Sequence, residues 1–215
     1  MIESATGLIL RTRPLTETSL IVHWLTADFG RIATVAKGAR RARSQFAGKL
    51  DLFYRADFSF SRSRRSDLHT LRETQLRETH AAIRGDIVKL RQAAYATSIL
   101  EQVTEPETPL PAIYGLMSGF LDCLCKKKAA RQLVFALELK LLEELGLAPN
   151  LAESPLTAGT KKAARMLARQ DWADGLRLKL AGAQATELRQ FLHGFLIFHL
   201  GRLPGGRVAA LAETA

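Results

Sequence analysis

The sequence has 215 residues, enough for one or two domains that bury a core without help from a metal or a disulfide. Hydrophobic residues make up 47% and charged residues 24%, which is ordinary globular usage and excludes a disordered or low-complexity chain. The formal net charge is +10, and an excess of this size on a small protein points to a polyanionic partner.

The two candidate polyanionic partners are nucleic acid and an anionic membrane. The longest uncharged stretches, residues 108–121 and 190–201, are shorter than the roughly 20 apolar residues that a spanning helix needs. The N-terminus carries Glu3 early and has no basic segment followed by an apolar one, so no export signal is recognised. We therefore expect a cytoplasmic protein with no membrane partner.

Before His80, short apolar segments alternate with a period of two, which is typical of strands. A glycine- and arginine-rich stretch, residues 38–48, separates the third segment from the fourth. Five short strands within about seventy residues fit a small closed barrel, and the OB-fold is the leading interpretation. The predicted strands cover residues 8–11, 20–25, 30–37, 51–61 and 68–73.

After His80 the apolar period becomes helical, with Thr160 as the N-cap of one short helix and residues 147–159 as a loop. The fold class is therefore α+β, with the strands first and the helices second. A five-stranded OB-fold barrel is expected over residues 1–79 and an all-α helical domain over residues 80–215. The predicted helices cover residues 83–105, 112–127, 131–145, 160–169 and 186–200.

Catalytic and cofactor signatures are missing from the sequence. There is no phosphate-binding G-x-x-x-x-G-K-[ST] loop, no G-x-G-x-x-G, no G-x-S-x-G and no H-E-x-x-H. Cys123 and Cys125 are the two cysteines, and their spacing leaves a zinc site two ligands short. We expect reduced thiols, no metal, no cofactor and no enzymatic activity.

Positive charge is concentrated in the first third, where residues 37–65 hold nine basic residues against Asp51 and Asp57. If the outward faces of the strands adjoin, their arginines line a groove that continues into the basic residues of the stretch 38–48. Such a groove would bind along a phosphate backbone. The alternative is a set of scattered, solvated arginines. The candidate contacts are Arg11, Arg13, Arg31, Lys37, Arg40, Arg41, Arg43 and Arg55.

Phe53 is an apolar residue on the polar face of the predicted fourth strand, beside Arg55. An exposed aromatic ring next to a cation is typical of a platform on which an unpaired base stacks. The alternative is that Phe53 packs under a loop or against the helical domain.

A second basic cluster comprises three consecutive lysines, Lys126, Lys127 and Lys128, together with Arg131. Positive charge at a helix end is favoured by the helix dipole, which explains the cluster without a partner. The functional alternative is that Lys127, Lys128 and Arg131 flank an apolar groove that takes an acidic, hydrophobic peptide tail.

Five short motifs follow one another in the first third of the chain: Gly-Leu-Ile-Leu from residue 7, Thr-Glu-Thr-Ser-Leu from 16, Leu-Thr-Ala-Asp-Phe-Gly-Arg from 25, Val-Ala-Lys-Gly-Ala-Arg from 35 and Thr-Leu-Arg-Glu from 70. Leu-Gly-Leu-Ala-Pro-Asn-Leu from 145 and Leu-Gly-Arg from 200 come later. Together, and in this order, they resemble the RecO family of bacterial DNA-repair proteins.

The resemblance implies an OB-fold followed by a helical domain. It implies binding to single- and double-stranded DNA, annealing of complementary strands, and association with the nucleoid. It also implies contacts with RecR and with the acidic C-terminal tail of single-stranded DNA-binding protein, and help in loading RecA. Lys37 and Arg40 fall in the Lys-Gly-Ala-Arg motif, which implies that they contact DNA.

The chain departs from the family pattern after Leu151, where many members carry four zinc-binding cysteines and this sequence has none. We therefore expect no zinc here. Two other functions fit the composition alone. One is an RNA-binding OB-fold protein, because a basic barrel does not by itself distinguish RNA from DNA. The other is a non-catalytic protein-binding adaptor.

Overall fold

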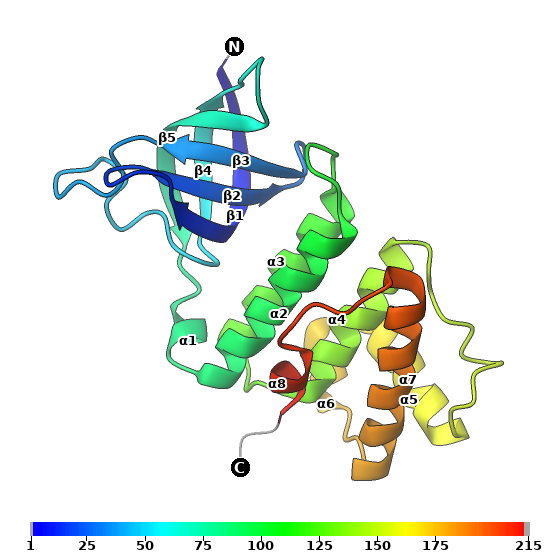
Figure 1. Ribbon diagram of the computed structural model, residues 1–215. Coiled ribbons are helices and arrows are strands. Elements are labelled where there is room, and N and C mark those ends of the chain that lie inside the picture. The colour runs from blue at the N-terminus through cyan, green and yellow to red at the C-terminus, as the bar shows by residue number, and fades with distance from the viewer. Residues whose placement is uncertain (1, 213–215) are drawn as a thin grey trace. The chain divides into compact units, whose positions relative to one another are not determined.

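Five strands close a barrel in the computed structural model, which describes residues 2–212 (Figure 1). Around the barrel the strands follow the order β1-β2-β3-β5-β4, and β1 pairs antiparallel with β4 to close it. Strands β3 and β5 pair in parallel. The predicted OB-type barrel is thereby confirmed. The strands are β1 (Ile2–Pro14), β2 (Leu20–Thr26), β3 (Arg31–Ala36), β4 (Arg55–Ser61) and β5 (Leu68–Glu78).

The long strand β1 pairs with β4 along its first half and with β2 along its second half, and a β-bulge interrupts it between Ile9 and Arg11. Ile9 lies opposite Trp24 and belongs to the core, whereas Arg11 lies opposite His23 and is exposed. The period of two expected for residues 8–11 would put Ile9 and Arg11 on one face. The extra residue in the bulge puts them on opposite faces, which corrects that expectation.

The barrel core is built around Trp24, whose ring stacks on that of Phe58 with a centroid distance of 4.0 Å. Trp24 Nε1 donates a hydrogen bond of 2.9 Å to Thr34 Oγ1, so the one polar atom of the indole is satisfied. Phe46, from the connection between β3 and β4, is also buried in this core. The basic stretch that contains Phe46 is thus anchored to the barrel.

Strand β4 begins at Arg55, four residues later than the predicted start. Phe53 has a φ of 65°, in the left-handed region, which an extended strand does not contain. The segment before Arg55 still binds β1, because the Ile9 amide donates to the Tyr54 carbonyl and the Phe53 amide donates to the Ile9 carbonyl, both at 2.8 Å.

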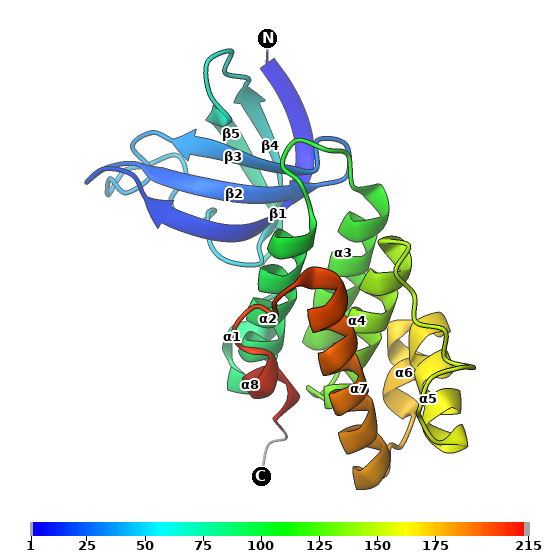
Figure 2. The same cartoon turned by 45° about the vertical axis from the view of Figure 1, so that its right-hand side comes forward.

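The helices follow the barrel in the chain, as predicted. In the helical unit α4 is the central helix and contacts α2, α5, α6, α7 and α8 (Figures 1 and 2). The predicted helix over residues 83–105 is divided into two helices, 81–84 and 87–103. The short helices over residues 172–177 and 207–211 were not predicted, because so short a segment carries no periodic signal. The helices are α1 (Ala81–Arg84), α2 (Ile87–Val103), α3 (Pro111–Lys126), α4 (Arg131–Glu144), α5 (Ala158–Arg169), α6 (Trp172–Arg177), α7 (Gly182–Leu200) and α8 (Arg207–Leu211).

The chain forms two compact units, and Thr104–Ser118 belongs to the barrel unit together with the chain up to His80. The linear division at residues 79 and 80 does not contain this return segment. The Leu110 amide donates to the Ala27 carbonyl, and the Glu107 amide to the Arg31 carbonyl, both at 2.9 Å. Gly30, with a φ of 62°, permits the close approach, because a Cβ there would collide with the Thr108 carbonyl oxygen.

Helix α5 begins at Ala158, two residues before the predicted N-cap Thr160. Thr157 occupies the cap position. Glu187 from α7 accepts hydrogen bonds from the Thr157 amide and from the hydroxyls of Thr157 and Thr160. A carboxylate from a distant helix thus binds at the N-terminal end of α5, where negative charge is favourable, and sequence spacing alone does not reveal it.

A buried ion pair lies inside the helical unit. Glu138 is fully buried, and its two oxygens accept hydrogen bonds from Arg207 Nε and Nη2 at 2.6 and 2.8 Å. The Tyr95 hydroxyl donates a further bond of 2.6 Å to the same carboxylate. The pair holds the short helix α8 against α2 and α4.

We predict that Arg207→Ala destabilises the helical unit by about 3–5 kcal/mol, because it leaves the Glu138 charge buried without its cation. Urea unfolding followed by far-UV circular dichroism measures the change. Arg177→Ala, at an exposed arginine of the same unit, is the matched control and should unfold like the wild type. An Arg207→Ala midpoint equal to that of the control would contradict the assigned role of the pair.

Candidate nucleic-acid interface

The side chains that point outward from four strands form one surface, which we call the outer face. Arg11 on β1 lies opposite His23 on β2, and His23 lies opposite Ala33 on β3. At about 4.8 Å between neighbouring strands, the face is roughly 14 Å wide from β1 to β5. The outer face consists of Arg11, Arg13, Ile21, His23, Ala33, Val35, Leu68 and Thr70.

The outer face has cations along one edge and a floor of small or apolar side chains. Arg11 and Arg13 are exposed on β1, whereas Ala33 and Val35 in the floor are half-buried. Arg13 Nη2 donates to His23 Nε2 at 3.3 Å, so this arginine lies along the face. Barrels of this topology use the β2–β3 side, together with the β1–β2 and β4–β5 loops, to bind oligonucleotides.

The basic loop, residues 37–50, is attached to the β1–β2 turn at the Arg13 end of the outer face. The Arg40 amide donates to the Thr18 carbonyl at 3.0 Å, and Arg40 Nη1 donates to the Thr16 carbonyl at 2.9 Å. Lys37, directly after β3, is exposed next to this contact. The anchoring brings Lys37 and Arg40 together with the β1 arginines.

The rest of the basic loop is a chain of tight turns. The Arg41 amide donates to the Gly38 carbonyl, and the Ser44 amide to the Arg41 carbonyl, both at 3.1 Å. Beyond them, Gln45 Nε2 donates to the Arg72 carbonyl at 3.0 Å, and the next residue is the buried Phe46. The loop therefore presents the exposed cations Arg40, Arg41 and Arg43 on a fixed backbone.

Arg31 and Arg55 lie in a different row of the barrel, with Leu25 and Leu8 between them. Both leucines are fully buried, so this row offers no open path between the two arginines. Arg31 Nη2 donates to the Thr104 carbonyl at 2.5 Å and ties the return segment to the barrel. The predicted continuous groove is therefore corrected: Arg31 and Arg55 are separate from the other six basic residues.

Phe53 does not form a stacking platform. Its side chain is only 3% exposed, and its carbonyl accepts a 2.6 Å hydrogen bond from His80 Nδ1. Its left-handed backbone turns the ring inward, and this overturns the expectation of an exposed ring. The alternative, a packing role, is the one that the structure supports.

Lys127 and Lys128 are exposed in the connection between α3 and α4, and Arg131 begins α4. The Lys127 amide donates to the Cys123 carbonyl at 2.9 Å, which ends α3. A cavity of about 240 Å³ with both polar and apolar walls lies elsewhere in the helical unit, beside α4 and α5. Its lining includes Leu139, Pro149, Leu151, Arg165 and Arg169, but none of the three basic residues of the predicted tail site.

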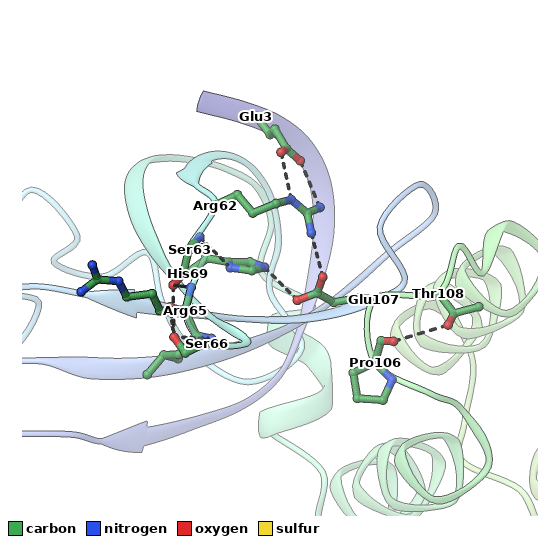
Figure 3. A network of polar contacts seen from close by, with 10 residues as sticks. Glu3, Arg62, Ser63, Arg65, Ser66, His69, Pro106, Glu107 and Thr108 are labelled. Atoms are coloured by element: carbon green, nitrogen blue, oxygen red, sulfur yellow. Dashed lines mark hydrogen bonds and ion pairs between the residues drawn. The ribbon is translucent and has the colours of Figure 1, made fainter. Parts of the chain in front are cut away.

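A polar network joins the start of β1, the β4–β5 loop and the return segment (Figure 3). Arg62 Nε lies 3.0 Å from Glu3 Oε1, and Arg62 Nη1 lies 2.7 Å from Glu107 Oε2. The hydrogen bond from Arg62 holds the pKa of Glu3 below its usual 4.5. Sequence reasoning missed this network because its members are far apart in the chain and carry no motif.

The buried histidine of the network, His69, connects it to the β4–β5 loop. The Ser63 amide donates to Nδ1 at 3.3 Å, so the proton of the neutral ring lies on Nε2. Nε2 is 3.2 Å from Glu107 Oε1. Glu107 thus contacts both Arg62 and His69.

The two cysteines are not disulfide-bonded: Cys123 is buried and Cys125 half-buried. Burial raises the pKa of the Cys123 thiol. Within residues 2–212 no three His, Cys, Asp or Glu side chains lie close enough to share a metal ion. No helix in that range is both long and apolar enough to cross a membrane.

The closed five-stranded barrel, its basic loop and the helices that follow define an OB-fold protein with a second, helical domain. Residues 1–80 match the family model described as "Recombination protein O N terminal", and residues 84–155 match "Recombination protein O C terminal". Together the two matches cover most of the chain. The chain belongs to the RecO family.

Several curated relatives are named "DNA repair protein RecO". That of Exiguobacterium sibiricum is 32% identical over 151 residues, covering 70% of this chain and 60% of that protein. That of Bacillus pumilus is 29% identical over 212 residues, covering 94% of this chain and 81% of that protein. That of Listeria monocytogenes is 30% identical over 158 residues, covering 74% and 61%. The matched region thus spans about three-fifths of the first and third relatives.

We predict that Phe53→Ala lowers the stability of the barrel by about 3–5 kcal/mol, the usual cost of truncating a buried phenylalanine. Thermal and urea unfolding measure this loss. Under conditions where the variant remains folded, any loss of affinity for single-stranded DNA relative to the wild type should be no larger than the loss for duplex DNA. A stable variant with a selective loss of single-strand binding would restore the stacking interpretation.

We predict that the Glu3–Arg62 pair makes barrel stability sensitive to acid. The pKa of Glu3 is lower in the folded protein than its ordinary value of 4.5. The stability that the ion pair contributes is therefore complete above pH 4.5 and is lost as the pH falls below that value and through the lowered pKa. The melting temperature of the wild type should therefore drop more between pH 5.5 and pH 3 than that of Glu3→Gln. Parallel melting curves of the two proteins test this, and equal drops would contradict it.

Proposed function

We propose that this protein binds single- and double-stranded DNA through the outer face and the basic loop, and that it acts in DNA repair as a mediator of recombination without bond chemistry of its own. One observation carries the proposal: two arginines lie along one edge of the outer face, and four further basic residues lie in a loop whose backbone is anchored at one end of that face. These residues are Arg11, Arg13, Lys37, Arg40, Arg41 and Arg43. The relatives' printed name, DNA repair protein, agrees with it.

The interface suits the annealing of complementary strands. Cations that neutralise phosphates on two strands lower the repulsion between those strands, and contacts to the backbone leave the base edges free to pair. Phe53, the one predicted stacking ring, is buried, so binding dominated by phosphate contacts is expected. Such binding weakens steeply with salt and carries little sequence preference.

The proposed partners follow the family resemblance: RecR, RecA as the protein loaded onto DNA, and the acidic C-terminal tail of single-stranded DNA-binding protein. Lys127 and Lys128 are exposed, which agrees with a contact to an acidic tail there, with Arg131 beside them. Each is a proposal for a binding experiment with the purified partner.

Two rival functions stay open to test. An RNA-binding protein would prefer an RNA oligonucleotide over DNA of the same sequence in direct competition. A protein adaptor would bind neither nucleic acid at low salt, yet would hold its partner protein at a salt concentration that abolishes phosphate contacts.

We predict that replacing Arg40, Arg41 and Arg43 with Ala lowers the affinity for single-stranded DNA and flattens its salt dependence. The slope is that of the logarithm of the binding constant against the logarithm of the salt concentration. Each lost phosphate contact reduces its magnitude by about 0.7, so three lost contacts reduce it by roughly two. Fluorescence anisotropy with a labelled oligonucleotide at several salt concentrations measures the slope. Mixing with the complementary strand then reports annealing, which should slow in the variant.

The matched control replaces Lys162, Arg177 and Lys179, three exposed cations of the helical unit, with Ala. It changes the net charge equally, so a general electrostatic effect would appear in both triple variants. A wild-type slope in the loop variant would remove the basic loop from the interface. Absence of wild-type binding at low salt would overturn the proposed function.

A further inference from the structure

The β4–β5 loop, residues 62–67, lies at the edge of the outer face opposite Arg11 and Arg13. It leads directly into Leu68, which pairs with Ala33, and into Thr70, which pairs with Val35. Arg64 and Arg65 are exposed in this loop, and its one acid is Asp67. The floor between this loop and the β1 arginines contains no acidic side chain, so cations flank both sides of it.

This loop is built on fixed contacts at its base. The Arg65 amide donates to Ser63 Oγ at 3.2 Å, and the hydroxyls of Ser63 and Ser66 lie 3.2 Å apart. The Ser63 amide is itself held by the buried ring of His69. In Figure 3 the Arg65 guanidinium extends away from the network, whereas the Arg62 guanidinium is turned into it.

We propose that Arg64 and Arg65 are a second pair of phosphate contacts, opposite Arg11 and Arg13, and that Glu107 is a positioning residue that holds their loop in place. The inference rests on the proposed function, because it adds residues to the same DNA interface. Its occupant is the sugar-phosphate backbone of a single DNA strand, whose charge complements cations on both edges of the face.

Glu107 can act on the loop because it contacts both of the residues on which the loop is built. One carboxylate oxygen lies 2.7 Å from Arg62 Nη1, at the first residue of the loop. The other lies 3.2 Å from His69 Nε2, and the opposite nitrogen of that ring accepts the Ser63 amide. His69 also stacks on Phe60, with centroids 5.3 Å apart, so its ring is held in position. Loss of the Glu107 carboxylate releases both contacts at once.

The first experiment measures the salt dependence of single-stranded DNA binding by Arg64→Ala/Arg65→Ala. Two lost contacts at about 0.7 each reduce the log–log slope by roughly 1.4, with a matching loss of affinity at low salt. The control is Arg177→Ala/Lys179→Ala, which removes two exposed cations from the helical unit. A loop variant with the wild-type slope overturns the proposed contacts.

The second experiment compares Glu107→Gln with Glu105→Gln, a substitution at an exposed residue of the same segment. Both substitutions remove one negative charge, and electrostatics alone would tighten DNA binding equally in the two. A positioning role predicts the opposite sign for Glu107→Gln: several-fold weaker binding. Amide hydrogen exchange over residues 62–68 should become faster in this variant alone.

Thermal unfolding establishes that both glutamine variants are folded at the temperature of the binding assay. Equal DNA affinities and equal exchange rates for the two overturn the role of Glu107. The result also separates this inference from the proposed function. Suppose that the wild type binds DNA and that the basic-loop triple variant shows a weaker salt dependence of binding. If the Arg64→Ala/Arg65→Ala variant then keeps the wild-type salt dependence, only this inference fails.

Discussion

The β-bulge in β1 is the constraint on which the interface depends. A single strand of thirteen residues must pair with β4 along one half and with β2 along the other to close the barrel, and it has to bend between the two. The bulge supplies the bend and changes which side chains point outward. Leu8, Ile9 and Leu10 are all buried around it, and the two arginines beyond it reach the surface. Without the bulge, strict alternation from Ile9 onward would direct Arg11 and Arg13 toward the core.

Fixed loops make the basic surface specific in shape as well as in charge. The basic loop is held by its buried phenylalanine and by hydrogen bonds to the β1–β2 turn, and the β4–β5 loop by a buried histidine. Arginine side chains lose considerable freedom when they bind, so a backbone that is already ordered reduces the entropic cost of each phosphate contact. Both loops remain exposed at their tips, where the contacts are proposed.

Periodicity predicted the barrel and the main helices, because strands and helices repeat their burial over short distances. The concentration of basic residues follows from counting charges along the chain. Periodicity could not predict the bulge, because Leu8, Ile9 and Leu10 are all apolar and leave no mark of the point where the alternation shifts. It also placed Phe53 wrongly, because a left-handed residue interrupts the strand pattern without a glycine to mark it. Arg31 and Glu107 act across distant parts of the chain, and such contacts depend on tertiary structure that no local pattern encodes.

The return segment also bears on how the protein is synthesised. Residues 104–118 complete the barrel unit by covering Gly30, accepting a hydrogen bond from Arg31 and supplying the carboxylate beside His69, yet they follow the whole of α2 in the chain. Domains generally fold in order as they leave the ribosome. Here the five strands have all emerged by residue 78, but the barrel unit stays incomplete until residue 118 has emerged, after the whole of α2. The two units are therefore interleaved in their folding order, although each has its own core.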